Sequence, residues 1–287
     1  MQGSIKGFNT AVIKHEDRFF ALALKLKKFD NQVKIYYLQH SILFDFMQIL
    51  MSRVNIITQR LAAEGETYKN EIAESNKNLI SNIPAIEVSE VQQPDSANRI
   101  ASLTLKAGVS HSSVIVVLHN EQVEILNIDD KQVGAFMIGV QQALKNAGEE
   151  NLLESYSAHL DHILLYATDM TGMPRIDYEQ YEHAAWKHAL FAHYVAVLYC
   201  FDINNGKKIM AGAVLKTSIE HRSAQEERLA RLIVSQCPKL KAFSDKYSLS
   251  MVMTQIIPST SGRPASLDDC LKPLRSFCAD VQASLPL

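Results

Sequence analysis

Five histidines lie within 35 consecutive residues in the third quarter of the chain, among several aspartates and glutamates: His159, His162, His183, His188 and His193. Imidazole nitrogens and carboxylate oxygens together suit zinc, manganese or iron, so this segment supports one candidate function, a metal-dependent hydrolase. The spacing argues against it, because residues five apart on a helix are rotated by about 140° and no HExxH motif is present. Packing or hydrogen bonding beside Trp186 is the preferred interpretation, and no cofactor is predicted.

Two pairs of neighbouring aspartates are the other candidates for chemistry, as a general acid and base. Asp129 and Asp130 form one pair, and Asp268 and Asp269 form the other. Both pairs stand where a helix is expected to begin, and aspartate is favoured there simply because it satisfies free backbone amides. Capping is therefore the preferred interpretation, and the sequence predicts no catalytic residue.

The elements that must position these residues show a faint internal repeat. Residues 33–54 align without a gap on residues 123–144, with identities at Val33/Val123, Ile35/Ile125, Phe46/Phe136 and Met47/Met137. Each copy is typical of a strand that runs into a helix, and two further strands are expected before each copy. The predicted fold class is therefore α+β, built from repeated antiparallel sheet-plus-helix (βββα-like) units.

The repeat suggests a domain organisation. Residues 1–86 are predicted to form the first βββα unit with its long helix, and residues 87–150 the second βββα unit. Residues 151–287 are predicted to form a larger α+β region with its own strands and helices. At 287 residues, the chain is long enough for two or three such domains.

The first long helix has apolar residues that alternate spacings of four and three: Leu43, Met47, Leu50, Val54, Ile57 and Leu61. Such a seam, repeating every 3.5 residues, is what a helix presents to a partner helix. Gly65 follows, and beyond it the pattern resumes, so the sequence allows either one long rod or a helical hairpin folded at Gly65. The seam predicts a homo-oligomer or a protein partner bound through this helix.

Several short motifs resemble the enterobacterial YjeJ family. They are Ser4-Ile5-Lys6-Gly7, Asn82-Ile83-Pro84, Trp186-Lys187-His188, Leu190-Phe191, Ala196-Val197-Leu198-Tyr199 and Gly212-Ala213-Val214. The similarity covers nearly the whole chain and is weakest between Pro94 and Tyr178. The resemblance implies a bacterial, cytosolic protein and supplies no catalytic residue.

Composition and charge exclude several classes of protein. The net charge is −2 and 47% of the residues are hydrophobic, which is typical of a folded globular protein rather than a disordered or membrane-spanning one. The N-terminal segment lacks the apolar core of a signal peptide, so a cytoplasmic location without membrane association is expected. The first 60 residues carry nine basic and four acidic side chains, which makes weak nucleic-acid binding a third, less favoured candidate.

The leading functional hypothesis is a non-catalytic interaction protein. It would act as an oligomeric scaffold, adaptor or regulatory subunit of a bacterial complex, with stress or phage defence as a context that no residue specifies. The hypothesis depends on the repeated units, on the helix seam and on the lack of a recognisable catalytic motif.

Overall fold

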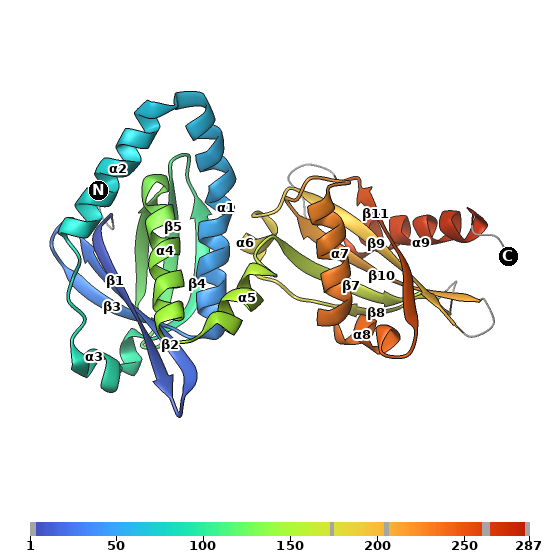
Figure 1. Ribbon diagram of the computed structural model, residues 1–287, viewed down its shortest axis with the longest axis horizontal. Helices are drawn as coiled ribbons and strands as arrows, with labels where there is room; N and C mark the ends of the chain where they lie inside the picture. The colour runs from blue at the N-terminus through green and yellow to red at the C-terminus, as the bar shows by residue number, and fades with distance from the viewer. Residues whose placement is uncertain (1–3, 173–174, 204–206, 260–264, 285–287) are drawn as a thin grey trace. The chain divides into compact units, whose positions relative to one another are not determined.

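The computed structural model describes residues 4–172, 175–203, 207–259 and 265–284. The chain forms two compact units, residues 1–160 and 161–287 (Figure 1). The described residues form three antiparallel sheets with helices packed against them, so the chain has a mixed α/β fold. The predicted segments 1–86 and 87–150 both lie inside the first unit, and their status as separate domains stays a prediction.

The first unit contains two three-stranded sheets. The first sheet is built from β1 (Ile5–His15), β2 (Arg18–Lys28) and β3 (Val33–Leu38), followed by α1 (His40–Glu64), α2 (Glu66–Ser81), α3 (Val88–Gln92) and the 3-10 turn η1 (Ser96–Asn98). The second sheet is built from β4 (Ile100–Ala107), β5 (His111–Leu118) and β6 (Val123–Asp129), followed by α4 (Asp130–Asn146) and α5 (Glu150–Ser157). The order strand, strand, strand, helix therefore occurs twice in this unit.

The two sheets also share their pairing register. Lys27 pairs with Val33 in the first sheet, and Val117 pairs with Val123 in the second, each 90 positions further along the chain. Both sheets have a register shift at the start of their first strand, between Ile5 and Gly7 and between Ile100 and Ser102. The parallel bridges Tyr37 to Arg99 and Ser4 to Asn127 join the sheets at corresponding positions.

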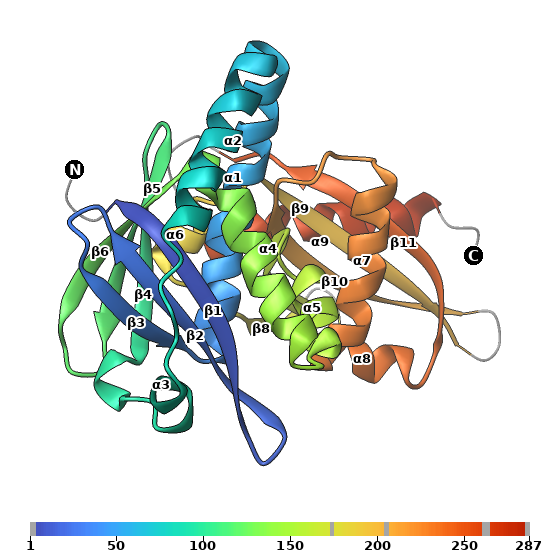
Figure 2. The ribbon, with the colours of Figure 1, turned by 60° about the vertical axis from the view of Figure 1, so that its left-hand side comes forward.

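The sequence left two alternatives open for the first long helix, a single rod or a helical hairpin. Helix α1 ends at Glu64 and α2 begins at Glu66, and the chain reverses direction between them (Figures 1 and 2). Gly65 stands at the reversal with φ of 57°, a left-handed backbone conformation that glycine adopts without the steric cost of a Cβ. Of the two predicted alternatives, the structure has the helical hairpin.

Helices α1 and α4 cover the inner faces of the two sheets. They pack against each other, α1 also contacts β4, and α4 also contacts β1. At their crossing, the aligned residues Phe46 and Phe136 meet edge to face, with ring centroids 6.1 Å apart. Phe8 of β1 stacks on Phe136 with a centroid distance of 4.1 Å. Phe46 and Phe136 are both buried. Two identical residues of the aligned segments therefore lie at the centre of this core.

The second unit is a five-stranded antiparallel sheet in the order β11-β9-β10-β7-β8. Its elements are β7 (His162–Asp169), β8 (Asp177–Gln180), α6 (Ala185–His188), β9 (His193–Asp202), β10 (Lys208–Thr217), α7 (Ala224–Gln236), α8 (Pro238–Ser244), β11 (Ser248–Ile257) and α9 (Leu267–Ser284). Helix α9 packs on one face of the sheet, and α7 and α8 pack on the other (Figure 1). Strand β9 is therefore apolar on both faces, as a central strand covered on both sides must be.

Candidate functional site

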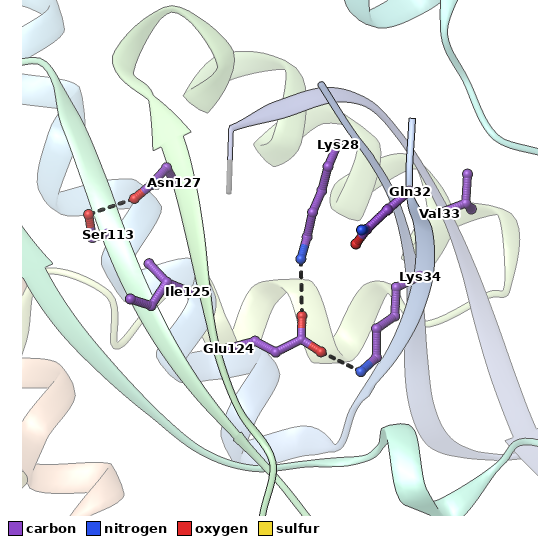
Figure 3. A pocket seen from close by; sticks show the side chains of 8 residues that line it. All are labelled: Lys28, Gln32, Val33, Lys34, Ser113, Glu124, Ile125 and Asn127. Carbon is purple, nitrogen blue, oxygen red and sulfur yellow. Dashed lines mark hydrogen bonds and ion pairs between the residues drawn. The ribbon is translucent and has the colours of Figure 1, made fainter. Parts of the chain in front are cut away.

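An open pocket of about 880 Å³ lies in the first unit between the β2–β3 hairpin and the β5–β6 hairpin. Lys28 and Lys34 extend into it from the first sheet, and Glu124 extends into it from β6 (Figure 3). The other lining side chains are Gln32, Val33, Ser113, Ile125 and Asn127. The pocket therefore combines a charged centre with apolar and amide groups on its wall.

Three side chains of the first sheet hold the Glu124 carboxylate. Lys28 Nζ lies 3.2 Å from Oε2, the Tyr36 hydroxyl donates to Oε2 at 2.6 Å, and Lys34 Nζ pairs with Oε1. Burial alone would raise the pKa of Glu124, but hydrogen bonds from Lys34, Tyr36 and Lys28 outweigh burial and hold this pKa below its usual range. The pKa of Tyr36 is raised, first by burial and then by its hydrogen bond to Glu124. At neutral pH the carboxylate is ionised and the phenol is neutral.

This arrangement is suited to binding rather than to proton transfer. A carboxylate with a lowered pKa is a weak base, and both of its oxygens already accept hydrogen bonds. Lys34 and Glu124 are also aligned with each other in the sequence repeat, 90 residues apart. Each lies on an edge strand of its sheet, so the ion pair links β3 to β6.

Replacing Glu124 with Gln will lower the free energy of unfolding at pH 7 by about 1.5–3 kcal/mol, because charge-assisted hydrogen bonds from two lysines are lost. The folded-state pKa of Glu124 is below its unfolded value. The stabilisation is therefore present above the unfolded pKa of about 4.3 and is lost as the pH falls through the folded pKa. Urea unfolding of both proteins at pH 7 and near pH 3 measures this, and a difference that does not shrink at low pH would contradict it.

The wall of the pocket continues into an uncovered apolar strip on the outer face of the second sheet. Val123 and Ile125 of β6 are 63% and 51% exposed. Their cross-strand partners on β5, Val117 and Ile115, are half-buried. Because side chains alternate across a strand, all four point away from the helix-covered face. We call these four residues the outer strip. Contiguous exposed apolar groups beside a pocket are typical of a binding surface.

The predicted metal ligands do not converge. His159 lies in the first unit, where its Nδ1 is 2.6 Å from the Ser155 carbonyl oxygen, and the other four histidines lie in the second unit. His162 and His193 both pair with Thr217 from opposite sides of β10, so their backbones are roughly 9–10 Å apart.

The remaining two histidines are close but do not complete a ligand set. The rings of His183 and His188 are 6.2 Å apart, and His183 Nε2 is 2.7 Å from the Leu164 carbonyl oxygen. The pKa of His188 is lowered, first by burial and then by His183 and Lys216. Across the residues that the structure describes, no three His, Cys, Asp or Glu side chains are placed to hold a metal ion.

The helix seam is divided by the fold. Leu43, Met47 and Leu50 are at most 2% exposed in the core of their own unit. Val54, Ile57 and Leu61, nearer the tip of the hairpin, are half-buried. Only this second group remains accessible to a partner, and its role in association stays a prediction. By length and composition α1 passes as a membrane-spanning helix, a criterion that buried core helices also meet.

The basic residues near the N-terminus are largely neutralised by acids from later segments. Lys25 pairs with Glu90, and Lys14 pairs with Glu149. Lys28 and Lys34 share Glu124, as described above. Nucleic-acid binding needs cations free to displace the counterions of phosphates, so these pairs weaken the third candidate function.

The sequence did not predict the outer strip, nor that Lys28, Lys34 and Tyr36 would hold the Glu124 carboxylate. One signal was present, since the gap-free repeat alignment sets Lys34 against Glu124. Opposite charges at aligned positions can meet when two repeats pack around a two-fold axis. The outer strip had no local signal, because Ile35 and Ile125 are aligned identical residues and only Ile35 is covered.

The fold and the pocket define a mixed α/β protein whose first unit pairs two similar sheets. The chain belongs to the YjeJ-like family, whose family model matches residues 1–284. It is 30% identical over 272 residues to "Uncharacterized protein YjeJ" of Escherichia coli (strain K12), covering 94% of this chain and 93% of that protein. The family resemblance predicted from short motifs is thereby confirmed. No solved structure matches the chain.

Proposed function

We propose that this protein is a non-catalytic interaction protein, an adaptor, scaffold or regulatory subunit that binds another polypeptide through its first unit. The observation that carries the proposal is the outer strip with its adjoining pocket. Burying the exposed parts of the Val123 and Ile125 side chains would contribute a favourable free energy of about 25 cal/mol for each Å² of apolar surface removed from water. The pocket's charged residues are engaged in mutual ion pairs, which supports recognition rather than catalysis.

We also propose that the two βββα segments of the first unit are repeats of one ancestral unit. The shared register, the register shift at the start of the first strand, and the corresponding bridges between the sheets support this. The meeting of Phe46 with Phe136 and of Lys34 with Glu124 supports it further, because aligned residues approach each other along a two-fold axis.

Replacing Ile125 with Asp will weaken retention of a partner or self-association by about tenfold or more, while the protein stays folded, because the substitution places a charge at the centre of an apolar interface. Ile138→Asp is the matched control, since Ile138 lies on α4 and is 67% exposed, away from the strip. Native mass spectrometry of the untagged protein from its own host reports both its oligomeric state and any retained polypeptide. A wild-type protein that is monomeric and retains no polypeptide would refute the proposed function.

A further inference from the structure

We propose, building on the interaction function above, that the outer face of the β4–β5–β6 sheet binds a short amphipathic segment of a partner protein. The chain supplies the template for this segment, because it covers the corresponding face of its own first sheet with such a segment. The partner is therefore defined by its chemistry, a short turn of helix with apolar side chains toward the sheet.

The template is the connection from α2 through α3. It runs across the β1–β2–β3 sheet (Figure 2), where Ile86 and Val91 pack on the outer-face residues Ile13, Ala21, Ala23, Ile35 and Tyr37. Polar contacts fix it in place. The Tyr37 hydroxyl donates to the Glu90 carbonyl oxygen at 2.9 Å, and Lys25 Nζ pairs with the Glu90 carboxylate at 2.8 Å. The capping box of Glu87 and Glu90 stabilises the single helical turn.

The second sheet has the same register, but among the residues that the structure describes its outer face is left exposed at Val123 and Ile125. Ile35 is 7% exposed beneath the template segment, whereas the aligned Ile125 is 51% exposed. Both are the outer-face isoleucine of the third strand, paired with Lys25 and with Ile115 respectively. The lower exposure of Ile35 goes with the covering segment on the first sheet, where the cross-strand neighbour is also different, Lys25 instead of Ile115. A segment bound in trans would remove this apolar area from water.

The differences between the two faces specify the partner. Lys25 and Lys27 of the first sheet correspond to Ile115 and Val117 of the second. A carboxylate placed like that of Glu90 would meet Ile115 where the first sheet has Lys25, so it would lose that ion pair and be partly desolvated against isoleucine, which is unfavourable. The partner segment must therefore present an apolar side chain at the position where the template presents Glu90.

This prediction can be tested on the full chain with two synthetic peptides. One has the sequence of residues 82–93, and the other has the same sequence with the substitution Glu90→Leu. Each is titrated to about 1 mM against isotope-labelled protein, and amide shifts are followed by NMR. The Glu90→Leu peptide is expected to shift residues of β5 and β6 and to bind about tenfold more tightly than the unaltered peptide.

Variants locate the site. Ile125→Asp should weaken binding of the Glu90→Leu peptide by about tenfold or more, and Ile138→Asp should leave it unchanged. Amide spectra of the free variants show that each is folded. Equal binding to the Ile125→Asp and wild-type proteins, or no binding of the Glu90→Leu peptide, would overturn the inference.

The outcomes separate this inference from the proposed function. If the peptide fails to bind and native mass spectra still show a retained polypeptide, the protein is an interaction protein that uses another surface. If Ile125→Asp instead abolishes only self-association, a second copy of this chain covers the strip, and the partner segment inferred here is wrong. If no polypeptide is retained and yet the peptide binds with the stated preference, the docking chemistry stands and the cellular role does not.

Discussion

Leu50→Asp is expected to unfold the first unit, whereas Val54→Asp is expected to leave it folded. Both residues belong to the same seam of α1, but Leu50 is 1% exposed and Val54 is half-buried. An aspartate at position 50 would either bury an unpaired charge or open the core. Changes of this kind cost more than about 4 kcal/mol, a large part of the stability of an ordinary domain.

Amide NMR spectra of the two variants measure this difference. Leu50→Asp should collapse the resonances of residues 4–160 to unfolded positions, while resonances of the second unit persist because that unit has its own cores. Val54→Asp should retain a dispersed spectrum from both units. A well-dispersed first unit in Leu50→Asp would mean that the seam is not part of the core as described.

This pair of variants also refines how the seam can be tested as an interface. Loss of association in Leu50→Asp would report unfolding and not a broken contact. Val54→Asp, together with substitutions at Ile57 or Leu61, probes the accessible half of the seam without disturbing the core. The interface role of α1 therefore depends on the variants near the hairpin tip.

Arg53→Met is expected to lower the free energy of unfolding of the first unit by about 3–5 kcal/mol. Arg53 Nε and Nη2 donate to the two carboxylate oxygens of Asp130 at 2.7 and 2.8 Å, and the side chains are 4% and 0% exposed. Nη2 also donates to the Val109 carbonyl oxygen at 3.2 Å. Removing the guanidinium leaves a buried carboxylate whose remaining cation, Arg60, is 3.8 Å away.

Urea unfolding followed at first-unit amides measures the loss. The double variant Arg53→Met, Asp130→Leu should recover most of it, because removing both charges also removes the desolvation cost. Arg231→Met is the matched surface control, since Arg231 and Glu227 form an exposed pair, 55% and 62% accessible, and should cost about 0.3–0.5 kcal/mol. An Arg53→Met variant as stable as this control would show that the buried pair contributes little.

The limits of sequence reasoning are clearest at the aspartates. The sequence predicts a capping role for Asp129 and Asp130, and Asp129 does cap α4, accepting a hydrogen bond from the Lys131 amide at 2.9 Å. Asp130 lies in the favourable first turn but is engaged by Arg53, 77 residues earlier in the chain. A capping motif can be predicted from the sequence because its partners are two or three residues apart. The buried ion pair of Arg53 with Asp130 could not be predicted in this way, because the two residues meet only when α1 packs across the start of α4.

The sequence by itself determined the order strand, strand, strand, helix that occurs twice in the first unit, whereas α3 and α5 had no predicted counterpart. It also determined the family and showed that Phe46 and Phe136 are identical residues at aligned positions. Hydrophobic periodicity, helix capping and residue identity are local properties of a chain, so they can be recognised without knowing which distant segments pack together. The tertiary structure decided which half of the helix seam is buried, that Glu124 meets Lys28 and Lys34, and that the outer strip is uncovered. The physical reason is that burial and pairing depend on which distant segments pack together, so the two aligned residues Ile35 and Ile125 differ in exposure although their strands are locally alike.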